Sequence, residues 1–294
     1  LASPHEKLFP PPSDENMITN PSQLHQRIRN ILGAVPINYD KKIQLSNKIQ
    51  TGENIFVFMA TYPGGFEKVG SAVKTMLNQT QKITKLVLHV NGNIMPPGLP
   101  KDSRLEVITS SVDYADNGKF KYMANHTGYL FTVDDDICYP SDYVEKMLQH
   151  IEYYDRKTLI GVHGAILPIG PPLTRWSFYR EMRRTHVFGK QHSSYGYANV
   201  IGTGTMAFHS DLGVPDFKQM DTKRMVDLHI ARWAQSSQIP MVICPRDDGW
   251  LSEFESNGEE RIWQTANVNS ELQREMISTL AKISKWTIPS NQVC

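Results

Sequence analysis

Cysteine is scarce in this sequence. Only Cys138, Cys244 and Cys294 occur in 294 residues, too few and too scattered for a disulfide framework or a cysteine-based metal site. Such use of cysteine is typical of a reducing compartment. No apolar run approaches the roughly 18 residues that a membrane-spanning helix needs, and the first residues lack a signal-peptide pattern. We therefore expect a cytoplasmic protein without a transmembrane segment, and peripheral contact with a membrane stays open.

An excess of either charge is also missing. The chain has 31 Lys and Arg residues against 30 Asp and Glu residues, which gives a net charge of +1. No global field therefore attracts it to nucleic acid or to a membrane. Its 294 residues, 40% of them hydrophobic, suffice for one large α/β domain or two small ones. Because the chain begins with Leu1 rather than Met, we also expect a trimmed chain or one module of a larger enzyme.

Segments typical of strands alternate with segments of helical spacing. Residues 1–21 are rich in Pro, Ser and Asn and predict a poorly packed leader, followed by a short helix at 24–32. Apolar runs predict strands at 54–60, 86–90, 105–108, 129–133, 159–162, 199–208 and 241–244. Helical spacing predicts helices at 66–77, 119–127, 143–148, 228–234 and 270–283. This order predicts an α/β fold, a doubly wound, mostly parallel sheet flanked by helices in a single main domain.

Three consecutive carboxylates, Asp134, Asp135 and Asp136, directly follow the apolar run at 129–133. Pro140 then breaks the strand, so the acids lie at the carboxyl edge of a strand, where open α/β sheets bind ligands. Adjacent like charges are costly to remove from water unless a cation compensates them. Mg²⁺ or Mn²⁺ suits carboxylate oxygens, so we predict a divalent-cation site here. The alternative is a solvated acidic turn.

Other predicted strands end in polar or glycine-rich turns. The first strand ends at Thr61, Tyr62 and Pro63, and the second ends at Asn91. Since parallel strands share one carboxyl edge, we expect Thr61 and Asn91 to lie near the three carboxylates.

Four segments occur in a characteristic order. The first strand ends in Ala60-Thr61-Tyr62-Pro63, and the helix after it ends in Thr75-Met76-Leu77-Asn78-Gln79-Thr80. Val133-Asp134-Asp135-Asp136-Ile137-Cys138-Tyr139-Pro140 carries an extended DxD pattern, and Val226-Asp227-Leu228-His229 precedes the helix at 228–234. In this order the segments resemble glycosyltransferases of the GT-A fold, most closely inverting enzymes similar to family 2, over roughly residues 53–250.

The sequence departs from that family's pattern at three places. The late acidic motif usually carries two acids, and the first of them is Val226 here. The acid that ends the second strand in many relatives is Asn91, and Gly64-Gly65 replaces the usual basic residue after Tyr-Pro. These departures concern the assignment of the catalytic base and the contact with the uracil ring of the donor.

The resemblance implies a nucleoside-diphosphate sugar as donor, with a UDP-sugar as the expectation, and Mn²⁺ or Mg²⁺ as cofactor. The departing diphosphate gains negative charge, which a divalent cation stabilises as a Lewis acid. The family pattern assigns Asp136 as the main metal ligand. It places Asp134 both at the metal and toward the nucleotide, and Asp135 toward the nucleotide. The alternative for at least one of these acids is a cap on the following turn.

The same resemblance assigns the nucleotide pocket and the base. Thr61, Tyr62, Pro63 and Asn91 would line the pocket. An inverting transfer needs a base that deprotonates the acceptor hydroxyl, and Asp227 is the candidate by position. The alternative for Asp227 is the N-cap of a helix beginning at the next residue.

Further candidates rest on weaker signals. His229 is a candidate third metal ligand, with a structural role as the alternative. Lys121 resembles a family lysine near the donor phosphates, and a solvated helix face is its alternative. Gly202 and Gly204 permit close approach of a ligand or of backbone, unless they mark a plain bulge. His163 and His209 rank lower still, near strands that could face the site.

Residues 170–197 combine rings and basic side chains, namely Trp176, Phe178, Tyr179, Arg180, Arg183 and Arg184. The rings could stack on sugar faces, although core packing is the more usual role at this spacing. The arginines could meet phosphate, although a solvated face is the more usual role.

These expectations divide the chain into a leader at 1–52, a glycosyltransferase domain at 53–250 and a helical extension at 251–294. Within the domain, residues 53–140 would bind the nucleotide and residues 141–250 the acceptor. We predict a hexosyl- or hexosaminyl-transferase that acts on a glycan hydroxyl in polysaccharide biosynthesis. The alternatives are a non-catalytic module that binds a nucleotide sugar, supported by Val226, and an aspartate-based phosphatase, whose motif fits poorly.

Overall fold

A computed structural model describes residues 52–166, 183–255 and 275 of the chain. The predicted leader, the rings at 176–179 and all but residue 275 of the predicted last helix lie outside the described residues.

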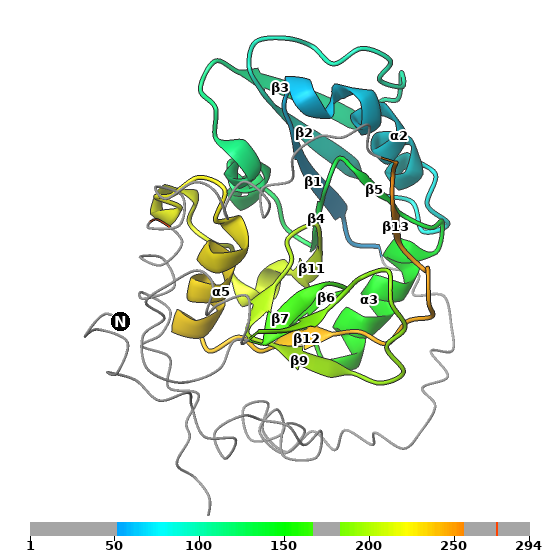
Figure 1. Ribbon diagram of the computed structural model, residues 1–294, viewed down its shortest axis with the longest axis vertical. Coiled ribbons are helices and arrows are strands. Elements are labelled where there is room, and N and C mark those ends of the chain that lie inside the picture. Colours follow the sequence, from blue (N-terminus) through cyan, green and yellow to red (C-terminus); the bar gives the residue numbers. More distant parts are fainter. Residues whose placement is uncertain (1–51, 167–182, 256–274, 276–294) are drawn as a thin grey trace, which may run out of the picture.

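The centre of the molecule is an eight-stranded sheet that runs through both predicted halves (Figure 1). In sheet order its strands are β3 (Leu105–Ser110), β2 (Lys85–Asn91), β1 (Ile55–Thr61), β4 (Tyr129–Val133), β11 (Thr205–His209), β6 (Leu159–Gly161), β12 (Met241–Ile243) and β9 (Gly196–Ala198). All run in one direction except β11 and β9, which are antiparallel to their neighbours. The predicted α/β class and the mostly parallel sheet are confirmed.

Helices cover both faces of this sheet because the strand residues alternate between two cores. Val57 and Met59 pack with α2 (Phe66–Leu77) and α3 (Tyr143–Tyr153). Phe58, between them, points to the opposite core, which α5 (Val226–Ser236) completes. Figure 1 shows the result, with α2 and α3 on one side of the sheet and α5 on the other.

The helix α2 has the bounds that the sequence predicts, because Val69, Ala72, Val73 and Met76 form one fully buried stripe. The helix predicted at 119–127 is wrong. Two short 3-10 helices, η4 (Ala115–Phe120) and η5 (Met123–Asn125), occupy this region. At Gly118 a Cβ would overlap the His89 ring, and glycine weakens a longer helix.

The strand predicted at 199–208 is also divided. Residues 202–204 form a turn between β10 (Val200–Ile201) and β11. Strand β10 leaves the central sheet and pairs with β7 (Gly164–Ile166), which in turn pairs with β8 (Arg184–His186). The glycines at 202 and 204 therefore mark a turn at the start of β11.

A short two-stranded ribbon follows the three carboxylates. It pairs β5 (Ile137–Cys138) with β13 (Ser252–Glu253). The Phe254 N–H donates to the carbonyl of Asp136 at 2.8 Å. The ribbon thus brings a fourth acid, Glu253, close to the triplet.

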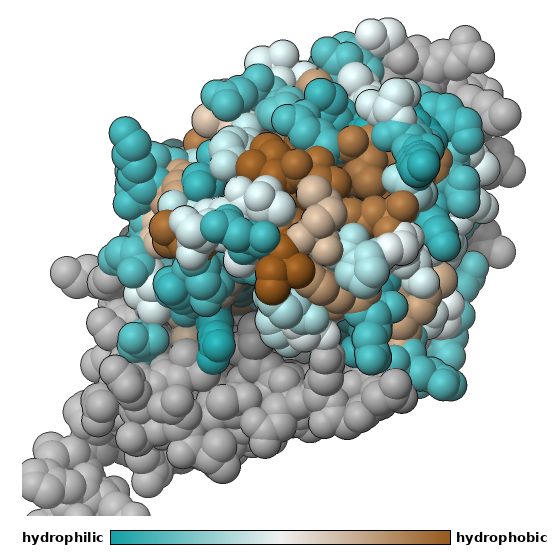
Figure 2. Space-filling model, turned by 90° about the horizontal axis from the view of Figure 1, so that it is seen from above, coloured by the Kyte–Doolittle hydropathy of each residue, from teal (hydrophilic) through white to brown (hydrophobic). Residues whose placement is uncertain are grey.

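The surface of the described part carries few large apolar side chains that are exposed, namely Tyr62, Ile94, Met95, Val112 and Val187. Figure 2 shows apolar side chains gathered on the face seen from above, bordered by hydrophilic ones. None of the helices in the described ranges combines the length and apolarity needed to cross a membrane.

Candidate functional site

Strands β1, β4 and β11 bring the candidate residues to one edge of the sheet. Strands β1 and β4 are parallel, with Met59 opposite Val133, so Thr61 lies beside the carboxylates that follow Val133. Strand β11 is antiparallel to β4, with Thr205 opposite Val133. The beginning of β11 therefore lies at the same edge as the ends of β1 and β4.

Asp135 is fixed against the end of β1. The Thr61 hydroxyl donates to Asp135 Oδ2 at 2.5 Å. A Cβ at Gly65 would overlap the same carboxylate oxygen, so no larger residue fits there. This accounts for glycine at position 65. Burial, with the nearby charges of Asp134 and Asp136, raises the pKa of Asp135 to about 7.

Asp134 is held by groups from three other segments. Its N–H donates to the Tyr139 hydroxyl at 2.8 Å, and that hydroxyl donates to the carbonyl of Gly204 at 2.6 Å. Its carboxylate forms an ion pair with Lys119 of η4, whose side chain is only 3% exposed. The ammonium of Lys121, the predicted phosphate ligand, instead lies 4.2 Å from the centre of the Tyr114 ring. The structure thus brings Lys119 to the acids, and a phosphate role for Lys121 stays a prediction.

The turn Gly202-Thr203-Gly204, hereafter the G-T-G turn, touches three site side chains in succession. A Cβ at Gly204 would overlap Asp134 Oδ2. The N–H and hydroxyl of Thr203 both donate to Asp227 Oδ1 at 2.8 Å. A Cβ at Gly202 would come within 2.8 Å of the His163 ring. Asp134, Asp227 and His163 therefore surround three consecutive residues.

Asp227 occupies the first turn of α5. This helix begins at Val226 with Met225 as N-cap, so the alternative that Asp227 caps it is wrong. Burial raises the pKa of Asp227 above its ordinary value, although the two Thr203 bonds oppose the shift. A raised pKa makes a carboxylate a stronger base. Val226 is only 3% exposed and lies in the apolar core, which explains why no second acid stands there.

Asp116 is a site residue that the sequence analysis missed. It lies on η4 and accepts the N–H of Arg224 at 3.0 Å. Burial, with the charges of Asp227 and Asp134, raises its pKa to about 6. Burial alone would lower the pKa of Lys119, but the carboxylates of Asp134, Asp116 and Asp227 raise it. The sequence shows only an acid and a lysine three residues apart, Asp116 and Lys119, which by themselves do not indicate a site.

The acids at this edge are poorly compensated. Burial, with the charges of Asp134 and Glu253, raises the pKa of Asp136 to about 6. Among the described residues, one buried lysine stands against the five aspartates at 116, 134, 135, 136 and 227. An additional cation would therefore be stabilised here.

The donor set suits a hard divalent cation. In residues 52–166 and 183–255, no three His, Cys, Asp or Glu side chains form a ready metal-binding group. Mg²⁺ is commonly held by one or two carboxylates, with water and substrate phosphates completing its coordination. Asp134 and Asp136 fit that mode, in which the ligand supplies the remaining oxygens.

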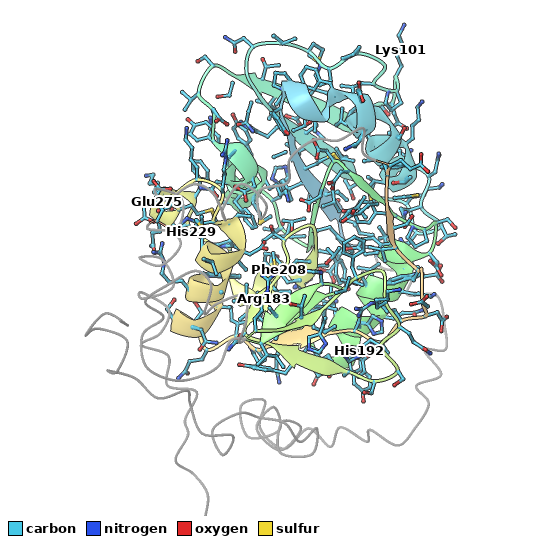
Figure 3. All side chains as sticks on the ribbon, in the orientation of Figure 1. Lys101, Arg183, His192, Phe208, His229 and Glu275 are labelled. Atoms are coloured by element: carbon cyan, nitrogen blue, oxygen red, sulfur yellow. The ribbon has the colours of Figure 1, made fainter. Side chains whose placement is uncertain are left out.

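His229 lies on α5 (Figure 3), and its ring is almost fully buried. Its Nε2 is 2.7 Å from the carbonyl oxygen of Thr222, and its Nδ1 is 3.9 Å from Asp221. Residues two apart on a helix do not face the same way, so His229 points away from the direction of Asp227. These contacts give its predicted metal role no support, and that role stays a prediction.

The remaining residues predicted to contact the nucleotide differ in their exposure and in the hydrogen bonds that they already make. The Asn91 amide donates to the carbonyls of Thr61 and Ala115 at 3.2 and 2.9 Å, and its oxygen accepts the N–H of Tyr114 at 2.8 Å. An aspartate could not donate these bonds, which explains the second departure from the family. Tyr62 is 52% exposed, and Pro63 begins the 3-10 helix η3 (Pro63–Gly65). Their binding roles stay predictions.

A comparison with solved structures gives a distant likeness. The sequence matches no protein-family model and no curated protein. A solved structure of the mannosyltransferase PcManGT from Pyrobaculum calidifontis, in complex with GDP-Man and Mn²⁺, is similar with a TM-score of 0.47 and 13% identity. The match covers 90% of this chain and 77% of that chain. A likeness at this level assigns no activity to the chain.

Proposed function

We propose that this protein is a metal-dependent glycosyltransferase. It moves a sugar from a nucleoside-diphosphate donor, a UDP-sugar by expectation, to a hydroxyl of a glycan acceptor with inversion. One observation carries the proposal. Thr203 bonds Asp227, the candidate base, and the next residue, Gly204, lies against Asp134, one of the acids that suit a metal.

Each group at the edge has a distinct task in this reaction. Asp134 and Asp136 would hold the cation, which stabilises negative charge on the departing diphosphate. Lys119 fixes the Asp134 carboxylate and supplies a positive charge beside it. Thr61 fixes Asp135, on the side where the nucleotide would bind.

Asp227 is oriented for proton transfer. Both Thr203 donors bind Oδ1, and this leaves Oδ2 to accept the proton of the acceptor hydroxyl. The raised pKa of Asp227, caused by burial, strengthens it as a base. The non-catalytic alternative gives Asp227 no such role.

The test is a thermal-shift panel of nucleotide sugars with and without Mn²⁺. A donor that binds the native state raises its melting temperature by mass action. We expect one donor to stabilise the protein only with Mn²⁺, and to be hydrolysed slowly. Asp136→Asn should abolish both effects, while Asp155→Asn, a change at an exposed acid, should alter neither.

Other outcomes separate the alternatives. Binding without hydrolysis or transfer to any of a broad set of glycans would favour the non-catalytic module. Turnover of p-nitrophenyl phosphate without sugar-nucleotide binding would favour the phosphatase. Stabilisation by no nucleotide sugar would contradict the proposed function.

A further inference from the structure

Strands β4 and β11 stop pairing at the edge that carries the site. Their last pair in register is Val133 with Thr205. The Thr205 carbonyl accepts the Val162 N–H at 3.2 Å, so the backbone of Thr205 faces away from β4. In an antiparallel ladder, pairs that exchange hydrogen bonds alternate with pairs that do not. The next pair in the same register, Asp134 with Gly204, is therefore the place where the two strands should bond directly.

The hydroxyl of Tyr139 occupies that place instead. It accepts the Asp134 N–H at 2.8 Å and donates to the Gly204 carbonyl at 2.6 Å. Two such bonds in series put the amide nitrogen and the carbonyl oxygen roughly 4–5 Å apart, whereas a direct bond would bring them to about 2.9 Å. The hydroxyl therefore holds the two strand ends about 1.5 Å further apart than a continuous ladder would.

Tyr139 is anchored independently of both strands. Its side chain is buried, and its ring centre lies 4.9 Å from that of Tyr143. The carbonyl of the next residue, Pro140, accepts the side-chain amide of Gln79 at 2.8 Å, which ties this segment to the chain just after α2. Burial raises the pKa of Tyr139 well above its ordinary value, so the hydroxyl keeps the proton that it donates to Gly204.

The separation matters because the two strand ends carry different parts of the proposed site. An added Cβ at Gly204 would overlap Asp134 Oδ2, so this glycine lies against a carboxylate that suits the cation. One residue earlier, the N–H and hydroxyl of Thr203 bond Asp227 at 2.8 Å. The position of the G-T-G turn relative to Asp134 therefore sets the position of the base relative to the metal ligands.

We propose that Tyr139 is a positioning residue whose hydroxyl sets the separation between the metal ligands and the base Asp227. This inference rests on the proposed function, because that function assigns the roles of Asp134 and Asp227. Without the hydroxyl, the Asp134 N–H and the Gly204 carbonyl would bond each other directly. The G-T-G turn would then shift toward Asp134 together with the group that holds the base. A misplacement of about 1 Å can lower a rate by about 100-fold.

The test removes one oxygen atom. Tyr139→Phe deletes the hydroxyl and keeps the ring. Tyr143→Phe is the matched control, because it deletes the same atom from a buried tyrosine whose hydroxyl has no hydrogen-bond partner among the described residues. Three quantities would be measured for each protein: the rate of sugar transfer or donor hydrolysis, the calorimetric affinity for the nucleoside diphosphate of the best-stabilising donor with Mn²⁺, and the crystal structure.

We expect Tyr139→Phe to lower the rate about 100-fold and to leave the affinity for the diphosphate with Mn²⁺ within about threefold of the wild type. Its crystal structure should show a direct bond of about 2.9 Å between the Asp134 nitrogen and the Gly204 oxygen. Tyr143→Phe should match the wild type in rate and affinity. A merely structural role for Tyr139 would lower the melting temperature and leave the rate of the folded protein unchanged.

An unchanged rate in Tyr139→Phe would overturn the inference, and so would an equal loss of rate in Tyr143→Phe. An affinity that falls as far as the rate would overturn it in favour of a role in binding. A wild-type crystal structure in which Asp134 and Gly204 bond directly would overturn it even if Tyr139→Phe did not fold. If the wild type neither binds nor turns over any nucleotide sugar, the proposed function itself fails, and the spacing by the hydroxyl is still decided by the crystal structures.

Discussion

The two ends of strands β1, β4 and β11 carry ionisable clusters of different character. At the end opposite the site, Arg156 contacts Glu53 at 2.8 Å and Glu152 at 2.7 Å. His209, the last residue of β11, contacts Glu53 at 2.9 Å, and the Tyr129 hydroxyl donates to Glu152 at 2.7 Å. The hydrogen bond from His209 lowers the pKa of Glu53. Glu53 and Glu152 therefore each have a basic partner within 3 Å.

The carboxyl edge of the same strands is compensated far less. Burial raises the pKa of Asp135 to about 7, and burial with neighbouring acids raises the pKa of Asp136 to about 6. Lys119 is the buried cation in the described part of this edge. The cluster around Arg156 therefore stabilises the fold by joining strand ends. The aspartates at the carboxyl edge are instead stabilised when a cation and a ligand bind. The predictions below test this division.

The largest expected difference is in the reaction rate. Asp227→Asn should lower the rate of sugar transfer, or of donor hydrolysis, by about 10²–10⁴-fold, because the amide cannot accept the proton. Donor affinity should stay nearly unchanged, since Asn keeps the oxygen that faces Thr203. Steady-state kinetics and calorimetry would measure both. The matched change at the other end of the strands, Glu53→Gln, should leave the rate unaltered. A similar loss of rate in Glu53→Gln would contradict the assigned difference between the two ends.

The next effect is on binding. Gly204→Ala places a Cβ against Asp134 Oδ2, so the carboxylate must move. Overpacking of this kind costs about 1–3 kcal/mol, and we expect Mn²⁺-dependent donor affinity to fall about tenfold or more. Gly52→Ala, at a position with nothing within 4 Å of the added Cβ, is the control. If Gly204→Ala kept the Mn²⁺-dependent donor affinity of the wild type, the position of the Asp134 carboxylate would be unimportant for donor binding.

The two clusters should also affect stability with opposite dependence on pH. The pKa of Asp116 is raised by burial to about 6, so the folded state holds its proton after the unfolded state has lost it. Stability from this group therefore falls as pH rises from about 4 to about 6, by roughly 1–3 kcal/mol. In metal-free protein, Asp116→Asn should remove this fall in the free energy of unfolding. Urea unfolding at several pH values would measure it.

Glu53 should show the reverse dependence. Its pKa is lowered by the hydrogen bond from His209, so its contribution is present above the ordinary glutamate pKa and is lost as pH falls through the lowered value. Glu53→Gln should therefore flatten the acid side of the stability profile. The same slope in Asp116→Asn and Glu53→Gln would contradict the assigned difference between the ends.

The smallest effect concerns stability at neutral pH. Glu53→Gln should destabilise the protein by only about 0.5–1 kcal/mol, because the pair is partly exposed. The shift that the donor and Mn²⁺ produce in the melting temperature should match the wild type. A reduced ligand-induced shift would show that the two ends are coupled.

The sequence predicted those features of the fold and site that depend on local pattern. The buried run at 129–133, followed by three acids and a proline, predicted a strand end with carboxylates at the sheet edge, as the structure has it. The stripe of α2 predicted that helix to the residue. Both signals lie within a few neighbouring positions.

Features that depend on strand direction and long-range packing could not be predicted in this way. Because β11 is antiparallel, the G-T-G turn reaches the carboxyl edge from the beginning of its strand. Lys119 and Asp116 reach the site from a 3-10 helix that no helical period announces. The lack of a hydrogen-bond partner for His163 Nδ1 among the described residues likewise requires coordinates to see.

The most direct test of the central claim is an anomalous difference map from crystals grown with Mn²⁺ and the best-stabilising nucleotide sugar. We predict a Mn²⁺ peak within coordination distance of Asp136, bridged by oxygens of the donor diphosphate, and no peak beside Glu53. An ordered donor without a peak at Asp136, or a cation bound only at the opposite end of the strands, would contradict the account.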